Sequence, residues 1–415
     1  MNLRSRVWGA SKVWTVKKPD IENYNKEWIN WIKKNDQFIT RCFSTITFGA
    51  TGFNDNISSE NEIHKYGGGI HFLNTKELKE ILGGVDEEEL ELLTNTVGKI
   101  SKVDKEYKEK YYKDCENEVS SIVCIPSLMR ALVQLRILKT LKQSTNSNEF
   151  IVDIGPGSGY FALLAALSGY KILATDISSG YFCFQKFLYE NILDQQYKMA
   201  DGLTEISSDT KLLHVPVWQW TNRNFKIPDN TSLIIANHVL NEMHRHSLIY
   251  LLELIEDSSC RNPQFAIEGW GYGSRTNPQL LQQTQKLFRL YGYKVRASLK
   301  SNKLHNIDIL EKATKKRIEN IDMMTNRTTE PLKILDNEIL ESITDRSGDL
   351  PMDNIRNPTG KLKIYSVEET FKILVGKFND QSQYLRLDQE FLEKIGVASD
   401  HNRMFFHGLE KGEYI

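Results

Sequence analysis

The chain has 415 residues, of which 40% are hydrophobic and 26% are charged, a balance typical of a globular protein with more than one structural unit. Its formal net charge of −1 argues against a protein that mainly holds nucleic acid phosphates, because such proteins carry a basic excess. The longest apolar stretch, residues 154–170, is interrupted by glycines and a proline, so no membrane span is expected.

The five cysteines are scattered and form neither a CxxC pair nor a Cys/His cluster. This pattern predicts neither a disulfide framework nor a metal site. The first residues, "MNLRSRVWGASKVWTVKK", lack the apolar core of a secretory signal, so we expect a cytoplasmic protein.

Residues 1–148 are predicted to form a mainly helical cap or substrate region. The segment "IENYNKEWINWIKKNDQFI" predicts a helix with four apolar side chains close to one face: Trp28, Ile29, Trp31 and Ile32. Two pairs are typical of capped helix starts: Asn74 with Glu77, and Asp86 with Glu89. Residues 127–141, "SLMRALVQLRILKTL", predict an amphipathic helix that leads through a polar linker into the next region.

Residues 149–313 alternate short apolar runs with helical patterns. The runs are "FIVDIG", "KILATDI", "LLHVPVW", "SLIIANHVL", "QFAIEGW", "YKVRASL" and "HNIDILEKA". Such alternation predicts an α/β fold, with a Rossmann-like, doubly wound, seven-stranded and mostly parallel sheet between two layers of helices. Ligands of such sheets bind at the carboxyl ends of the strands, where the strand order reverses.

A glycine loop joins the first predicted strand to a helix. Gly155, Gly157 and Gly159 permit positive φ and a close approach of the backbone to a ligand. Asp176 ends the second predicted strand, where a carboxylate can accept hydrogen bonds from ribose hydroxyls. The loop is therefore expected to bind a nucleotide or nucleoside.

The spacing of the loop separates two classes of ligand. Dinucleotide folds prefer GxGxxG, but the position of that third glycine is Tyr160 here. Asp153 also precedes the loop, and its negative charge is unfavourable beside a pyrophosphate but favourable beside a sulfonium or ammonium. The loop thus suits a cationic nucleoside better than a dinucleotide.

The stretch "VDIGPGSGYFALLAALSGYKILATDIS" resembles the first two motifs of class I S-adenosylmethionine-dependent methyltransferases. This resemblance implies S-adenosyl-L-methionine as the cofactor, with its methionine part near Asp153 and the loop and its ribose on Asp176. The cofactor-binding residues implied in this stretch are Asp153, Gly155, Pro156, Gly157, Gly159, Asp176 and Ile177.

The fourth predicted strand ends in residues that can carry the chemistry. Asn237 and His238 lie at its carboxyl end, over the expected cofactor site, and Glu242 and His244 follow. Methyl transfer needs an aligned acceptor, and a base helps to remove the proton of a sugar hydroxyl. His238 and Glu242 are the leading candidates for that base, with His244 next. Equally, His238 can be a structural residue, and Glu242 can simply favour a helix N-terminus.

A second, weaker resemblance concerns "VPVWQW" followed by "IIANHVLNEMH". These segments are similar to a bacterial group of proposed sugar O-methyltransferases, through Pro216, Trp218, Asn237, Glu242 and Met243. This resemblance implies a sugar or glycan substrate and a position for Trp218 near the adenine.

Plant-type small-molecule O-methyltransferases carry a His-Asp-Trp motif, whose histidine is the base, after the fourth strand. If residues 241–243, "NEM", occupy the place of that motif, its catalytic histidine is missing here. The base then comes from elsewhere, or the reaction depends only on the alignment of the substrate.

The fifth predicted strand ends in "AIEGWGYGS". Glu268, Trp270 and Tyr272 are predicted to face the substrate, because a carboxylate and aromatic rings suit a polyhydroxylated ring. The alternative is a glycine-rich turn with exposed aromatic residues.

Other functions are weighed against these motifs. Residues 237–240 lack the Asn/Asp-Pro-Pro-aromatic tetrapeptide of nucleic acid amino-methyltransferases, and no Pro-Cys nucleophile stands there. A protein-methylating or other small-molecule methyltransferase stays open. From another class, an NAD-dependent oxidoreductase also stays open.

Residues 314–415 are predicted to form an α+β extension of unclear role. Within it, "YSVEETFKILVGKF" predicts a helix whose start is capped by Ser366 and Glu369.

Overall fold

A computed structural model gives the fold of the chain. It describes residues 21–34, 63, 78–79, 82–111, 122–141, 148–200, 209–222, 225–237, 239–240, 245–258, 260, 262–268, 284–285, 287–301, 305–312 and 363–378.

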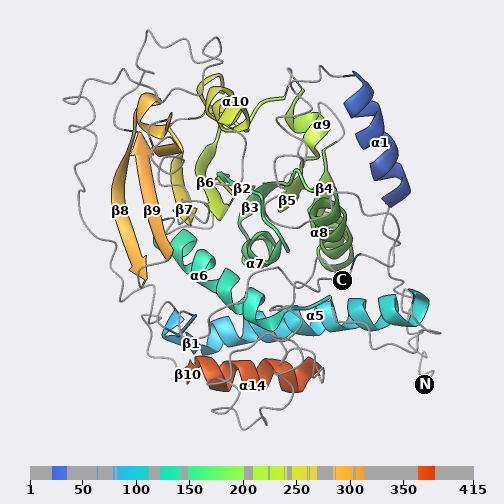
Figure 1. Ribbon diagram of the computed structural model, residues 1–415. Helices are drawn as coiled ribbons and strands as arrows, with labels where there is room; N and C mark the ends of the chain where they lie inside the picture. Colours follow the sequence, from blue (N-terminus) through green and yellow to red (C-terminus); the bar gives the residue numbers. More distant parts are fainter. Residues whose placement is uncertain are drawn as a thin grey trace, which may run out of the picture.

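A mixed sheet forms the centre of the molecule (Figure 1). Its strands, in spatial order, are β4 (Tyr197–Met199), β5 (Leu212–His214), β3 (Lys171–Thr175), β2 (Phe150–Ile154), β6 (Thr231–Asn237), β7 (Gln264–Glu268), β9 (His305–Lys312) and β8 (Tyr293–Ser301). The six strands from β4 to β7 are parallel, whereas β9 runs antiparallel to both β7 and β8. The doubly wound, mostly parallel sheet is therefore confirmed.

The prediction of seven strands is wrong by one. All seven apolar runs are strands, but the edge strand β4 joins them, so the sheet has eight strands among the described residues. The segment Tyr197–Met199 has only three residues, all half-buried, and so gives no apolar run in the sequence.

The strand order reverses beside β2. From β2 the chain proceeds through β3, the edge strand β4 and then β5 on one side, and it returns to β6 and β7 on the other. Right-handed crossovers then place the connecting helices on opposite faces. Helices α7 (Tyr160–Leu167) and α8 (Ser179–Ile192) cover one face, and α10 (Arg245–Glu256) covers the other (Figure 1).

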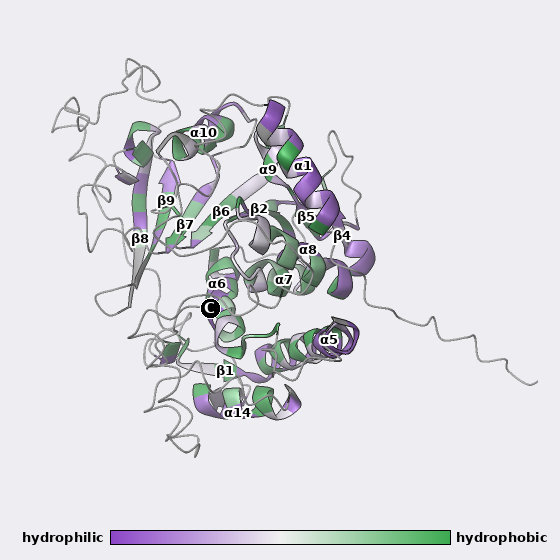
Figure 2. Ribbon diagram, turned by 45° about the vertical axis from the view of Figure 1, so that its right-hand side comes forward, coloured by the Kyte–Doolittle hydropathy of each residue, from purple (hydrophilic) through white to green (hydrophobic). Residues whose placement is uncertain are grey.

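Helix α6 (Ile125–Leu141) differs from its prediction. It was expected to be amphipathic, but most of its surface is buried, including the charged Arg136, and Ser127, Arg130 and Gln134 form only a half-buried stripe. The cause is its position, because α6 packs against α7 on one side and against α5 (Glu87–Tyr111) and α14 (Val367–Phe378) on the other. Hydrophobic residues accordingly colour much of α6 and α7 (Figure 2).

Two segments far apart in the sequence form one layer below α6. Strand β1 (Gly84–Asp86) pairs antiparallel with β10 (Ile364–Ser366), and α5 lies beside α14 (Figure 1). Part of the C-terminal region thus completes the N-terminal one.

Both helices of this layer begin with the predicted capping boxes. The Glu89 backbone N–H donates to Asp86 Oδ1 at 2.8 Å, and the Asp86 N–H donates to Glu89 Oε2 at 3.2 Å. In the same way, the Glu369 N–H donates to Ser366 Oγ at 3.1 Å, and the Ser366 N–H donates to Glu369 Oε2 at 2.8 Å. The pair Asn74 and Glu77 lies outside the described residues.

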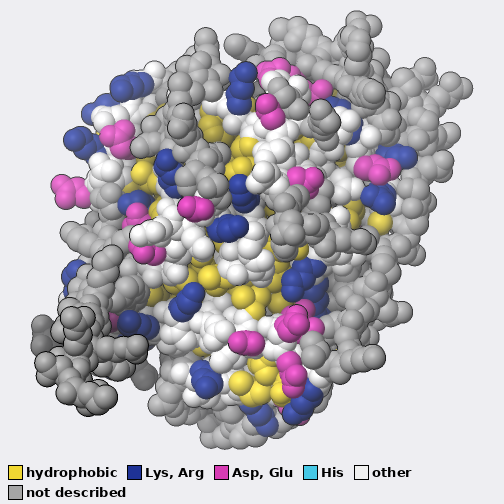
Figure 3. Space-filling model, turned by 180° about the vertical axis from the view of Figure 1, so that it is seen from behind, with side chains coloured by type: hydrophobic (Ala, Val, Ile, Leu, Met, Phe, Trp, Pro, Cys, Tyr) yellow, Lys and Arg dark blue, Asp and Glu magenta, His cyan; other side chains and the backbone are white. Residues whose placement is uncertain are grey.

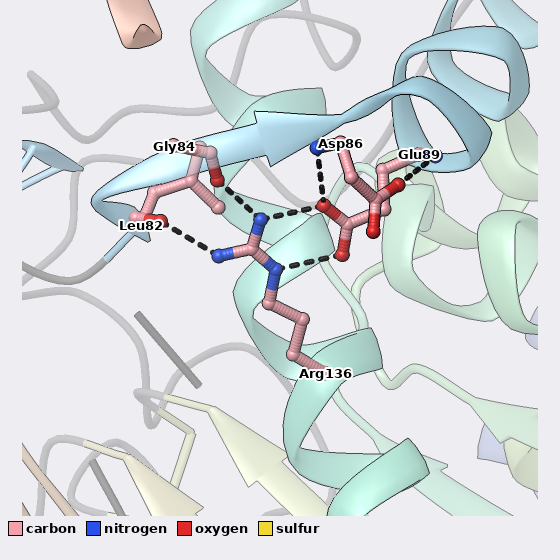
Figure 4. Close-up of polar contacts among 5 residues, drawn as sticks. All are labelled: Leu82, Gly84, Asp86, Glu89 and Arg136. Carbon is pink, nitrogen blue, oxygen red and sulfur yellow. Dashed lines mark hydrogen bonds and ion pairs between the residues drawn. The ribbon is translucent and has the colours of Figure 1, made fainter. Parts of the chain in front are cut away.

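A buried ion pair joins this layer to α6 (Figure 4). The Arg136 guanidinium donates through Nε and Nη2 to the two carboxylate oxygens of Glu89, at 2.7 and 2.6 Å. It also donates to the backbone oxygens of Leu82, at 2.6 Å, and Gly84. Every neighbour of the guanidinium in Figure 4 is thus an acceptor, and Glu89 serves both this pair and the helix cap.

We expect Arg136→Met to lower the free energy of unfolding by about 3–5 kcal/mol, measured by urea denaturation. The substitution leaves the Glu89 carboxylate and two carbonyl groups buried without their partner. Lys105→Ala is the control, because Lys105 pairs with Glu109 at 3.9 Å on the surface and its loss should cost less than about 1 kcal/mol. A similar cost for both variants would contradict the role of Arg136.

Candidate functional site

The carboxyl ends of the six parallel strands lie along one edge of the sheet. In register, Ile154 of β2 lies between Thr175 of β3 and Ala236 of β6. Asn237 pairs with Glu268 of β7 further along the same edge. Because the strand order reverses beside β2, this edge is where a doubly wound sheet binds ligands. The sequence-predicted cofactor residues come together here.

The glycine loop has the conformation expected of a ligand cradle. Gly155, Gly157 and Gly159 have φ values of 62°, 57° and 74°. A Cβ on Gly155 would lie 2.5 Å from Val239, and one on Gly159 would lie 2.2 Å from the Tyr189 hydroxyl oxygen, so both positions also lack room for a side chain. A Cβ on Gly157 would meet nothing within 4 Å. Gly157 therefore presents its backbone to open space, as a binding loop must.

Asp176 follows β3 and is buried, with 6% of its surface exposed. Its Oδ1 accepts from the Ser178 N–H at 2.9 Å, and its Oδ2 accepts from Gln185 Nε2 at 3.0 Å. Burial raises the pKa of Asp176 to about 6, while the hydrogen bonds from Ser178, Gln185 and the backbone of Gly157 act in the opposite direction. The carboxylate is thus fixed in direction and linked to the glycine loop.

A chain of buried polar groups orients Gln185. Its Nε2 donates to Asp176 and also to the Gly157 carbonyl at 2.6 Å, so its Oε1 is left as an acceptor. His214 Nε2 lies 3.0 Å from that oxygen, and the Tyr197 hydroxyl lies 3.3 Å from His214 Nδ1. These contacts assign the proton of His214 to Nε2, with Nδ1 accepting from Tyr197. Burial lowers the pKa of His214 well below its usual value, and the ring is neutral.

Asp153 is the most unusual group of the site. It is 1% exposed, and neither carboxylate oxygen has a hydrogen-bond partner among the described residues. Burial first, and then the nearby Asp176, raise the pKa of Asp153 well above its usual value. A buried carboxylate without donors is costly, so a ligand that brings donors or positive charge would relieve it.

The remaining predicted cofactor residues lie along the same edge. Pro156 is in the loop, Ile177 follows Asp176, and Asn237 ends β6; all three are half-buried. Trp218 lies on the short helix α9 (Val217–Trp220), which follows β5, and is also half-buried. The structure therefore brings all nine together, at the ends of β2, β3, β5 and β6.

Of the predicted catalytic and substrate residues, the structure describes Glu268. It is 3% exposed, and its carboxylate accepts from Arg130 of α6, with Gln134 Nε2 at 3.5 Å. A ligand that reaches Glu268 therefore meets an Arg–Glu pair and not a lone acid. The others lie outside the described residues: His238, Glu242, His244, Trp270 and Tyr272.

Several residues of the site were not found from the sequence. Gln185 and His214 have no motif that ties them to Asp176, since the contacts arise only when α8 and β5 pack together. Arg130 gave no signal within an apolar helix. On α1 (Ile21–Lys34), the predicted apolar face is wrong in part. Ile29 is 48% exposed there, whereas Tyr24, Trp28 and Trp31 are buried.

A hollow lies at the other end of the parallel strands, where β6 and β7 begin. It has a volume of about 930 Å³ and is lined by the starts of β6 and β7 and by Arg296, Glu311 and Lys312. Arg296 pairs with Glu311 at 3.7 Å, and Lys312 pairs with Glu256. The acids Glu149 and Asp229 also line it, and it lies away from the strand ends that doubly wound sheets use.

Three general properties complete the description. On the face shown in Figure 3, the described basic side chains are interspersed with acidic ones. No group of three or more His, Cys, Asp or Glu side chains able to hold a metal occurs in the described parts of the chain. Among those same residues, no helix is both long and apolar enough to cross a membrane.

No model of a known protein family matches the sequence, and curated proteins give no significant match. Among solved structures, the chain is similar to an S-adenosylmethionine-dependent methyltransferase from Aquifex aeolicus, with 14% identity, a TM-score of 0.28, and coverage of 42% of this chain and 88% of that one. A TehB-like S-adenosylmethionine-dependent methyltransferase from Corynebacterium glutamicum has 11% identity and a TM-score of 0.29, and the match covers 50% of this chain and 97% of that one. The mitomycin 7-O-methyltransferase MmcR has 14% identity and a TM-score of 0.32, and the match covers 52% of this chain and 60% of that one. At TM-scores this low, the chemistry must come from the residues of the site themselves.

We expect Asp153→Asn to raise the free energy of unfolding at pH 8 by at least about 1 kcal/mol, because it removes a buried charge without donors. The pKa of Asp153 is higher in the folded than in the unfolded chain. The wild-type chain therefore loses stability as the pH rises from the unfolded value towards the folded one, and the gain of the variant should shrink at pH 4. Chemical denaturation at both pH values measures this difference.

The exposed Asp257 provides the control for this experiment. Asp257→Asn should leave the pH dependence of stability unchanged. A loss of stability in Asp153→Asn at pH 8 would mean that the carboxylate has a partner in the free protein.

Proposed function

We propose that the chain is an S-adenosylmethionine-dependent methyltransferase that methylates a hydroxyl of a sugar or glycan by in-line displacement. The observation that carries the proposal is the buried carboxylate of Asp153, which has no partner among the described residues and stands beside a positive-φ glycine loop. S-adenosylmethionine supplies a methyl group on a sulfonium and also carries an ammonium. Both positive charges suit an acid in this position.

Different residues of the site bind different parts of the cofactor. Asp153 and the backbone of the glycine loop hold the amino-acid part of the cofactor. Asp176, whose direction is fixed by Ser178 and Gln185, accepts hydrogen bonds from the ribose. The neutral His214 keeps the Gln185 amide in the orientation that donates to Asp176.

The acceptor side is assigned to the ends of β6 and β7. Asn237 and Glu268 are neighbours there, on the side of β2 opposite to β3 and β5. His238, Glu242 and His244 follow β6 in the chain, and we assign the base to this group, with His238 and Glu242 first. Trp270 and Tyr272 follow β7 and are assigned to the sugar ring. The sequence pattern supports these roles.

An NAD-dependent oxidoreductase is the alternative from another class, and the geometry disfavours it. The helix that would face a pyrophosphate begins with Tyr160, which is buried. Its hydroxyl donates to the Ile122 carbonyl and accepts from the Cys124 N–H, both at 3.0 Å, so it ties the loop to the start of α6. The buried Asp153, which precedes the loop, would also repel a pyrophosphate.

Calorimetry with the full chain tests the cofactor. We expect S-adenosylhomocysteine to bind the wild type and NADH to give no heat. Asp153→Asn should weaken binding of S-adenosylhomocysteine about 10- to 100-fold, the range for one hydrogen bond to a charged group. Heat with NADH alone would refute the methyltransferase.

Turnover tests the acceptor and the base. With labelled S-adenosylmethionine and a panel of nucleotide sugars and glycans, methyl transfer should occur to one of these acceptors; transfer only to a polypeptide or another small molecule would favour the alternative methyltransferases. We expect His238→Ala or Glu242→Ala to lower kcat about 100-fold or more, because a positioned base contributes that much. His246→Ala, on α10, is the control. If neither of the first two variants changes turnover, the base assignment is wrong.

A further inference from the structure

We propose that Tyr24, on the N-terminal helix α1, belongs to the cofactor site and that its hydroxyl binds the nucleoside part of the cofactor. This inference rests on the proposed function, and it assigns to α1 a role in binding that the glycine loop and its acid do not reveal.

Helix α1 is fixed against the elements that flank Asp176. It packs on α8, which follows β3, and on α9, which follows β5; it stands beside α9 in both ribbon views (Figures 1 and 2). At its far end, Trp31 Nε1 donates to Thr221 Oγ1 at 2.9 Å. Tyr24 and Trp31 are seven residues apart, about two turns, and so share one face of α1. The same face that anchors the helix therefore carries Tyr24 inward.

The ring of Tyr24 completes an aromatic wall. It lies 5.0 Å from the Phe182 ring and 4.9 Å from the Trp218 ring, measured between centroids. Phe182 in turn stacks on His214 at 3.8 Å, and His214 contacts Gln185, the partner of Asp176. Tyr24 is thus connected through ring contacts to the group that orients the ribose-binding acid. Flat aromatic surfaces of this kind suit a purine base.

The hydroxyl of Tyr24 lacks a hydrogen-bond partner within the described part of the chain, as expected of a group that binds a ligand. The residue is 3% exposed, and its hydroxyl oxygen is buried without a hydrogen-bond partner among the described residues. Buried hydroxyl groups normally have partners, so a missing one calls for an explanation. Burial, and then the thiol of Cys183 and the carboxylate of Asp176, raise the pKa of Tyr24 well above its usual value. The hydroxyl therefore stays protonated and shares its surroundings with Asp176.

The position of Tyr24 indicates that it contacts the nucleoside of the cofactor and not the methyl acceptor. Strands β3 and β5 lie on one side of β2, and β6 and β7 lie on the other. Tyr24 contacts residues that follow β3 and β5, whereas the acceptor side is assigned to the ends of β6 and β7. Asp176 follows β3 as well, so a nucleoside held on Asp176 would lie on the side of the site to which Tyr24 belongs, where the Tyr24 hydroxyl can donate to it.

Calorimetry on the full chain tests this inference with two probes. S-adenosylhomocysteine carries the nucleoside and the amino acid, and 5′-methylthioadenosine carries the nucleoside alone. We expect Tyr24→Phe to weaken both about 2- to 10-fold, the effect of one neutral hydrogen bond. The thermal midpoint of the free variant should not fall, because the hydroxyl makes no hydrogen bond in the free protein. If the hydroxyl had only a structural role, the thermal midpoint of the free variant would fall and the affinity for both probes would not change.

Tyr293→Phe is the matched control. The hydroxyl of Tyr293 is also buried without a partner among the described residues, but it lies in β8 at the far edge of the sheet. Binding of both probes should be unchanged in this variant.

The outcomes separate the two proposals. Unchanged affinity in Tyr24→Phe, or a loss confined to S-adenosylhomocysteine, would overturn the nucleoside contact while the wild type still binds. A loss of affinity accompanied by a lower thermal midpoint of the free protein would show a packing role and overturn it as well. If the wild type binds neither probe, the cofactor assignment itself fails.

Discussion

The reversal of strand order beside β2 is the constraint on which the site depends. Because the chain leaves β2 for β3 in one direction and returns to β6 in the other, the crossover helices diverge to opposite faces and leave the strand ends between them accessible. The two acids of the site are set at this point, with Asp153 within β2 and Asp176 just after β3. Their proximity follows from parallel pairing in register, which aligns Asp153 with Ala174.

The sequence predicted the features that depend on local order along the chain. Each apolar run became a strand, the glycine loop took positive φ, and the boxes at Asp86 and Ser366 formed as expected. These outcomes require only neighbouring residues, so a single sequence contains their signal. The prediction failed where burial depends on tertiary packing, as in α6, which is mostly buried because α7 packs on one side of it and α5 and α14 on the other.

The same distinction explains which parts of the candidate site were missed. Asp153, Asp176 and the loop fall within one continuous stretch and could be read together. Gln185 reaches Asp176, and His214 reaches Gln185, only after α8 and β5 have packed, and Tyr24, which we propose for the same site, lies on a helix more than a hundred residues earlier in the chain. No spacing rule links such positions, and β4 was missed for a simpler reason, since three half-buried residues have no periodicity.

Two buried polar groups of this chain illustrate opposite uses of the same physics. Arg136 is fully surrounded by acceptors, and this arrangement holds the N- and C-terminal layer against α6. Asp153 is as deeply buried but has no donor among the described residues, and we therefore expect it to lower the stability of the free protein. Folding alone does not favour such a group, whereas a ligand that satisfies it gains more affinity than it would from an exposed acid. The unsatisfied hydroxyl of Tyr24 follows the same logic, and both groups support the proposal that this edge of the sheet binds a ligand.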